Sequence, residues 1–154
     1  MNSKIFLVFP FIGKTMVCEA YPKSIINGDI EFEKYLASKN HKEGNDLSKA
    51  LIEWLNLVND KKILLLNASS EYINILNDNN ILYTLVFPEE SLKSVYIDKI
   101  KDFITEEELN EFEKTFTDNV LRLKQDTKNV HIILSNPEDT IEGVLKEFNI
   151  LNEN

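Results

Sequence analysis

The residues with the clearest chemical signature lie near the N-terminus, where Gly13 is followed directly by Lys14 and Thr15. These three residues match the end of the phosphate-binding pattern G-x-x-x-x-G-K-[ST], in which a glycine-containing turn joins a buried strand to a helix. Backbone N–H groups at such a turn favour phosphate oxygens, a lysine ammonium adds positive charge, and a threonine hydroxyl can bind Mg²⁺. The segment therefore predicts a site for ATP and Mg²⁺.

This predicted phosphate-binding loop (P-loop) assigns roles to five residues. We expect Pro10, Ile12, Gly13, Lys14 and Thr15 to bind the cofactor, with Lys14 also acting in catalysis and Thr15 also serving as the metal ligand. The site should lie outside the carboxyl ends of the strands, where open parallel sheets bind their ligands.

The loop departs from the full pattern at two positions. Val8 replaces the first glycine, and Phe11 stands where small nucleotide kinases commonly have another. A β-branched valine resists the backbone angles that glycine adopts, and phenylalanine adds bulk where the backbone must approach phosphate. Two interpretations therefore stay open, a working nucleotide loop and a Gly-Lys-Thr turn without function. A collapsed loop with Phe11 filling the pocket would favour a kinase-like scaffold that has lost its function.

Length and composition limit the classes of protein that the chain can belong to. Its 154 residues indicate one domain, 1–154, and a net charge of −9 argues against non-specific binding to nucleic acid. The single cysteine, Cys18, excludes an intramolecular disulfide, and two isolated histidines make a histidine-based zinc site improbable. No apolar run is long enough to span a bilayer, so we expect a cytoplasmic protein without a membrane partner.

Short apolar runs and amphipathic stretches alternate along the chain. Strands are expected at 5–9, 24–27, 62–66, 81–87 and 130–134. Several of these runs are apolar without alternation, which is typical of strands buried on both faces of a parallel sheet. The pattern predicts an α/β fold, a three-layer αβα domain with a mainly parallel five-stranded sheet.

Helical periodicity fills the intervals between the strands. Apolar stripes at helical spacing cover 47–58, 92–103 and 109–123. Asn45 is the expected N-cap of the first stripe, and Thr105 with Glu108 forms a capping box before the third.

Three other stretches carry weaker expectations. The last helix should open at Asn136-Pro137 and bury Phe148, because proline suits the first helical turn. The polar stretch 31–44 is expected to be a mobile connection over the edge of the sheet. The segment 89–128 is long for one crossover, so we expect two helices there, either a lid insertion or plain packing.

Three stretches beyond the loop carry a resemblance to a known family. Asp29 and Phe32 follow the second predicted strand, the serine-containing segment 67–70 follows the third, and 81–88 reads I-L-Y-T-L-V-F-P. With the loop, these stretches resemble small P-loop proteins of phages and Firmicutes that are similar to adenylate kinase and other nucleoside monophosphate kinases. The resemblance implies phosphoryl transfer from ATP to a small (deoxy)nucleotide.

The family's lid helix carries arginines that neutralise the transferred phosphoryl group, and this chain departs from that pattern. The comparable stretch 94–101 offers only Lys99 and Lys101, and the whole chain contains one arginine, Arg122. Lysine keeps the charge but lacks the bidentate geometry of a guanidinium. The departures suggest a kinase-like scaffold that has lost or changed its reaction.

Five residues outside or beside the loop are the remaining candidates. Asp29 and Lys99 are candidate catalytic residues, and Asp29, Asn67, Ser69 and Lys93 are candidate substrate-binding residues. Plainer roles compete with three of them. Asp29 could belong to a turn, Ser69 could be a helix N-cap, and Lys93 could lie on a solvated helix face.

Two functions from different classes remain open at this point. The first is a nucleotide-binding protein of the nucleoside monophosphate kinase type. The second is a catalytically inactive interaction protein on the same fold, for example a phage accessory or inhibitor factor with a protein partner. A third, weaker interpretation uses the helix expected at 105–124 as an assembly surface.

Overall fold

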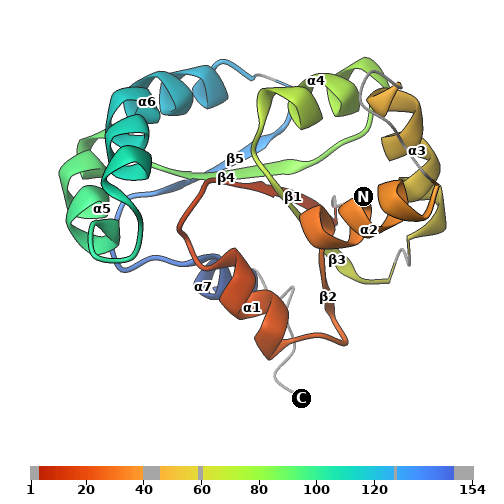
Figure 1. The fold of residues 1–154 in the computed structure, drawn as a ribbon, viewed down its shortest axis with the longest axis horizontal. Coiled ribbons are helices and arrows are strands. Elements are labelled where there is room, and N and C mark those ends of the chain that lie inside the picture. Colours follow the sequence, from red (N-terminus) through yellow and green to blue (C-terminus); the bar gives the residue numbers. More distant parts are fainter. Residues whose placement is uncertain (1–3, 40–45, 59–60, 127, 148–154) are drawn as a thin grey trace.

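The sheet of the computed structural model contains five strands, all parallel, in the order β2-β3-β1-β4-β5 (Figure 1). Residues 4–39, 46–58, 61–126 and 128–147 are described. The strands are β1 (Ile5–Val8), β2 (Ile25–Asn27), β3 (Ile63–Asn67), β4 (Thr84–Pro88) and β5 (Val130–Leu134). All five expected strands are present, and the expected α/β class and three-layer arrangement are confirmed.

Helices cover both faces of this sheet. They are α1 (Lys14–Ala20), α2 (Gly28–Ser38), α3 (Leu47–Leu57), α4 (Ser70–Asp78), α5 (Lys93–Ile100), α6 (Glu106–Lys124) and α7 (Ile141–Glu147), with a 3-10 turn, η1 (Glu90–Leu92), before α5. Helices α1 and α7 lie together on one face, and α2 to α6 lie on the other (Figure 1). No helix in the described ranges is both long and apolar enough to cross a bilayer.

The core follows from the apolar runs of the central strands. Leu7, Leu65 and Leu85, from β1, β3 and β4, have no exposed surface because helices cover them on both sides. Strand β5 has a more exposed pattern, as expected for an edge strand.

Two expected helix starts can be compared with the structure. Thr105 accepts from the backbone N–H of Glu108, whose carboxylate accepts in turn from the N–H of Thr105, so the predicted capping box is confirmed. The expected cap at Asn45 lies outside the described residues. Asp46 caps α3 instead, by accepting from the backbone N–H of Lys49 at 3.2 Å.

The expectation of a mobile connection at 31–44 is wrong for its first part, because α2 continues to Ser38. Burial of Phe32 stabilises this helix, because its ring packs against Trp54 of α3 with 5.3 Å between ring centroids. Residues 40–44 lie outside the described part of the chain.

The last helix begins at Ile141, four residues after the expected start at Pro137. The backbone N–H of Asn136 donates to the carboxylate of Asp139 at 3.2 Å, and the Asn136 side chain accepts from the N–H of Glu138 at 3.0 Å. These local bonds hold a turn that competes with the helix. The expected burial of Phe148 falls outside the described residues.

The segment 89–128 contains two helices, as expected. Tyr96 of α5 and Phe116 of α6 are buried, and α6 packs on β4, so the pair forms part of the layer over the sheet. That this pair moves as a lid stays a prediction.

Gly28 at the start of α2 generates a stability prediction. A Cβ atom there would lie 2.7 Å from the Leu65 carbonyl oxygen and 2.6 Å from a Leu66 methyl carbon. We expect Gly28→Ala to lower the free energy of unfolding by about 1–3 kcal/mol through overpacking, measured by urea denaturation. Gly143→Ala is the control, because its Cβ would lie no nearer than 3.7 Å to Thr140. Equal stability of the two variants would contradict the proposed close packing of α2 on β3.

Candidate functional site

The Gly-Lys-Thr segment lies at the junction between β1, the middle strand of the sheet, and α1. The loop is fixed at both ends. The backbone N–H of Phe9 donates to the Val86 carbonyl, and the Ile12 carbonyl accepts from the N–H of Ile141, both at 2.9 Å. Lys14 thus begins the helix that follows the middle strand, which is the position that the sequence predicted.

Two residues of the loop have left-handed backbone angles. Gly13 has a φ of 95° and Phe11 has a φ of 68°. The second value explains why glycine would suit position 11, because a side chain there is strained. The Phe11 ring lies over α6, edge-on to Phe112 with 5.3 Å between centroids, and is 49% exposed. The loop is therefore not collapsed around Phe11.

An open hollow of about 330 Å³ remains beside the loop, here called the loop hollow. It is lined by Phe9, Pro10, Phe11, Lys14, Thr15 and Asn67. Within the described residues, the backbone N–H groups of Lys14 and Thr15 have no acceptor. The Ile12 side chain is buried, so this residue can offer the site only its backbone.

Asp29 joins the ends of neighbouring strands. Its carboxylate forms an ion pair with the Lys14 ammonium and accepts from the backbone N–H of Asn67 at 3.2 and 3.4 Å. The Lys14 and Asp29 side chains are only 16% and 22% exposed, so solvent screens this pair less than a surface pair. Three candidates from the sequence, Lys14, Asp29 and Asn67, therefore come together.

The remaining candidates lie apart from this cluster or have other partners. Ser69 caps α4 by accepting from the backbone N–H of Tyr72 at 3.2 Å, which is the plainer of its two expected roles. Lys93 and Lys99 are both on α5, which lies on the β4–β5 side of the sheet (Figure 1). The Lys99 ammonium donates to the Pro137 carbonyl at 2.5 Å. Neither lysine is hydrogen-bonded to Asp29 or Asn67.

A second hollow of about 380 Å³, here called the α2 hollow, shares the lining residue Asn67 with the loop hollow. It is lined by Asp29, Phe32, Glu33, Leu36, Leu47, Asn67 and Tyr72. Burial, followed by the charges of Asp29, Glu71 and Glu33, raises the pKa of Tyr72 to about 12, so its hydroxyl stays protonated near neutral pH.

Glu33 and Tyr72 were missed by the sequence analysis. The signal for Glu33 was its spacing, because Asp29 and Glu33 are four residues apart, as are Phe32 and Leu36. On a helix each pair shares a face. The expectation of a connection at 31–44 hid this pattern.

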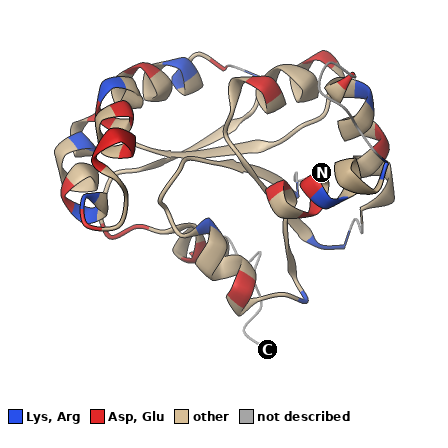
Figure 2. Ribbon diagram, viewed as in Figure 1, with Lys and Arg blue, Asp and Glu red and all other residues tan. Residues whose placement is uncertain are grey.

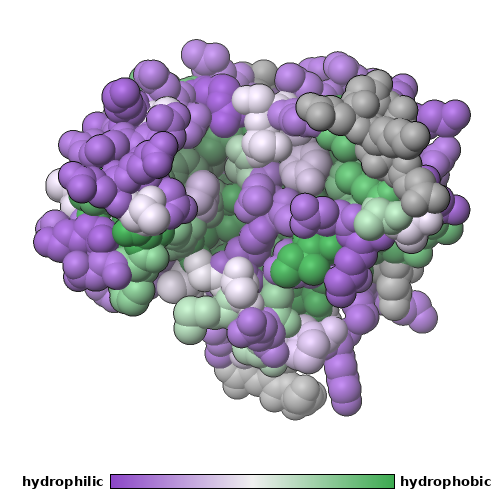
Figure 3. All heavy atoms as spheres, viewed as in Figure 1, coloured by the Kyte–Doolittle hydropathy of each residue, from purple (hydrophilic) through white to green (hydrophobic). Residues whose placement is uncertain are grey.

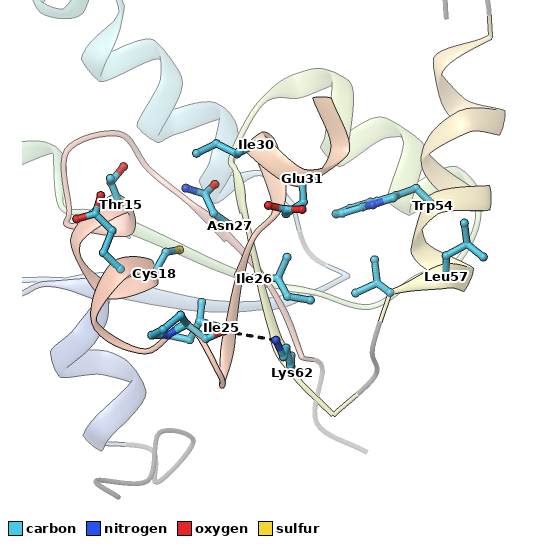
Figure 4. Close-up of a pocket in the computed structure, with 13 residues that line it drawn as sticks. Thr15, Cys18, Ile25, Ile26, Asn27, Ile30, Glu31, Trp54, Leu57 and Lys62 are labelled. Atoms are coloured by element: carbon cyan, nitrogen blue, oxygen red, sulfur yellow. Dashed lines mark hydrogen bonds between the residues drawn. The ribbon is translucent and has the colours of Figure 1, made fainter. Parts of the chain in front are cut away.

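A larger groove of about 670 Å³ runs along the edge strand β2, between α1 and α3 (Figure 4). Thr15 and Cys18 line it from α1, and Trp54 and Leu57 line it from α3. The side-chain oxygen of Asn27 is buried there without a hydrogen-bond partner in the described part of the chain. This groove shares only Thr15 with the loop hollow.

Charge and hydropathy differ across the surface. Basic and acidic residues are interspersed along α5 and α6 (Figure 2). Helix α1 begins at Lys14. Apolar residues gather in a hollowed region between α5–α6 and α2, above α1 (Figure 3). Neither view shows a continuous basic face.

No family model and no curated protein sequence matches this chain significantly. The resemblance to nucleoside monophosphate kinases is therefore a prediction from the residues quoted above.

Cys18 generates a prediction about reactivity. Burial raises the pKa of its thiol to about 11, and the nearby Lys14 ammonium lowers it only in part. The reactive thiolate should therefore form only as pH approaches 11, so alkylation by iodoacetamide at pH 8.5 should be at least about tenfold slower than for a free cysteine with its pKa of about 8.5. Alkylation followed by mass spectrometry would check this, with the urea-unfolded protein as control. Equal rates in the folded and unfolded protein would contradict it.

Proposed function

We propose that the crevice at Lys14 binds the phosphates of ATP, and that the chain is a phosphotransferase of the nucleoside monophosphate kinase type. The observation that carries this proposal is the Lys14 ammonium beside an open hollow at the carboxyl end of the central strand. Phosphates are bound at such strand-to-helix turns by backbone N–H groups and a lysine.

The connections of the sheet support the same position. After β1 the chain enters α1 on one face, and after β3 it enters α4 on the other face (Figure 1). Adjacent strands β1 and β3 therefore send their connections to opposite sides, which opens a crevice between their carboxyl ends. Lys14 and Asn67 lie at this crevice.

The implied Mg²⁺ fits the oxygen groups that are present. Thr15 has an exposed side chain in the loop hollow, and Asp29 supplies a carboxylate nearby. No group of three or more His, Cys, Asp or Glu among the described residues could hold a metal alone. Mg²⁺ commonly binds through one or two protein oxygens together with phosphates and water, and it would neutralise phosphate charge here.

Nucleotide binding on this proposal requires the Lys14–Asp29 pair to separate. Lys14 would turn toward the phosphates, and the Asp29 carboxylate would keep its bond from the Asn67 N–H. Lys99 could add charge near the transferred group only after leaving the Pro137 carbonyl.

A second candidate, a catalytically inactive interaction protein on this fold, is favoured by the place of the single arginine. Arg122 lies in the last turn of α6, shortly before β5 begins. It is therefore near the amino ends of the strands, opposite the crevice. An arginine at the transferred phosphoryl group can be worth about 10³-fold or more in rate, and this chain has none there.

Replacing Lys14 tests the two candidates. We expect Lys14→Ala to weaken Mg-ATP binding at least about tenfold in isothermal titration, because it removes the ammonium at the phosphates. Lys34→Ala is the matched control, since Lys34 is exposed and pairs with Glu31 on the surface. The control should bind like the unchanged protein.

A flat titration of the unchanged protein with Mg-ATP would exclude the nucleotide proposal. Binding without turnover of any deoxynucleotide or deoxynucleoside in a coupled assay would favour the inactive candidate. That candidate also requires Lys14→Ala to leave the biological activity intact.

A further inference from the structure

The α2 hollow has the chemistry to select an acceptor. We propose that it binds an uncharged, hydroxyl-bearing molecule with a flat body, of the nucleoside class, in preference to a nucleoside monophosphate. This inference rests on the proposed phosphotransferase function and changes its acceptor.

The charges that line the α2 hollow are the first argument. Asp29 and Glu33 project from one side of α2 and both line the hollow. A phosphate dianion placed between them would face two like charges, whereas hydroxyl and amino groups would donate to them. None of the described lining residues is a lysine or an arginine. The nearest ammonium of the cluster, Lys14, already faces Asp29.

The walls of the hollow are the second argument. The half-buried Tyr72 ring lines the hollow together with Leu36 and Leu47, and it packs edge-on against the buried Phe32 with 6.3 Å between ring centroids. Aromatic side chains of this kind stack on bases without needing a particular sequence of hydrogen-bonding groups. The volume of about 380 Å³ falls within the range of small-molecule sites. The Asn67 side chain and the Tyr72 hydroxyl add polar groups that can orient a base or a sugar.

The position of the hollow is the third argument. The loop hollow and the α2 hollow share the lining residue Asn67, whose backbone N–H donates to Asp29. An acceptor hydroxyl beside Asp29 would therefore face the terminal phosphate of a nucleoside triphosphate held at Lys14. The reaction follows from this juxtaposition.

In that reaction the acceptor oxygen forms a bond to the terminal phosphorus atom. The bond from this phosphorus to the bridging oxygen breaks, and the nucleoside diphosphate leaves with that electron pair. The hydroxyl proton passes to the Asp29 carboxylate, which Lys14 has released by turning to the phosphates. The products are the acceptor phosphate ester and the nucleoside diphosphate.

Binding measurements without triphosphate test the ligand class directly. The full chain is titrated calorimetrically, at low salt, with the four common deoxynucleosides and with their 5′-monophosphates. At least one nucleoside should bind about tenfold or more tightly than its own monophosphate, as expected for repulsion of a dianion. Equal or tighter binding of the monophosphates overturns the proposal, as does the absence of binding by every nucleoside.

A pair of variants on α2 isolates the charge. Glu33→Gln should reduce the preference for nucleoside over monophosphate several-fold, because it removes one of the two like charges. Glu33 is exposed, so the fold should tolerate the change. Glu31→Gln is the matched control, because Glu31 lies on the same helix but lines the groove along β2. An unchanged preference in Glu33→Gln overturns the assigned role of the hollow.

The same titrations separate this inference from the proposed function. Lys14→Ala should weaken Mg-ATP binding at least about tenfold. Mg-ATP binding without nucleoside binding overturns the acceptor proposal alone. Nucleoside binding without Mg-ATP binding overturns the phosphoryl transfer and supports the ligand class of the hollow.

Discussion

The candidate site depends on the ion pair and the hydrogen bond that the Asp29 carboxylate forms. This carboxylate accepts from the Lys14 ammonium after β1 and from the backbone N–H of Asn67 at the end of β3, while its own helix follows β2. Partly buried charges are stable only when they are paired and hydrogen-bonded, and here one side chain meets both needs. The carboxyl ends of three strands are therefore held in one arrangement, in which Lys14 lines the loop hollow and Asp29 lines the α2 hollow.

The strands of the sheet could be predicted from sequence because the apolar run that marks each strand is a local pattern. Runs such as 62–66 and 130–134 are rich in isoleucine, leucine or valine, and the intervals between successive runs are long enough for helices. The place of Lys14 at a strand-to-helix junction followed from the same pattern. The turn at 136–139 was less predictable, because side-chain bonds to the backbone overrode the preference of proline for a helix start.

The partners within the site were not predictable, because they depend on strand order. Asp29 follows Lys14 by 15 residues and meets Asn67 from 38 residues away. Only the placement of β3 between β1 and β2 brings these residues together. The helical nature of α2 was also hidden, since Phe32 gains its burial from Trp54 on another helix. Glu33 could be recognised only once that helix was known.

The loop shows how a departure from glycine is tolerated. A left-handed residue other than glycine costs on the order of 1 kcal/mol, and the edge-on contact of Phe11 with Phe112 offsets a cost of that size. The ring lies on the α6 side of the loop hollow and leaves the Lys14 side open. Phe11 therefore forms part of the wall of the loop hollow and does not block the side on which Lys14 lies.

The balance of charge at the crevice restricts what can react there. One ammonium, Lys14, stands against the carboxylates of Asp29 and Glu33. A bare triphosphate would add negative charge to this surrounding, so a nucleotide should enter as its Mg²⁺ complex. A phosphate group on the acceptor would raise the repulsion further. The chain's one arginine could not offset that charge, because it lies at the other end of the sheet. The proposed neutral acceptor would add no further charge to this crevice.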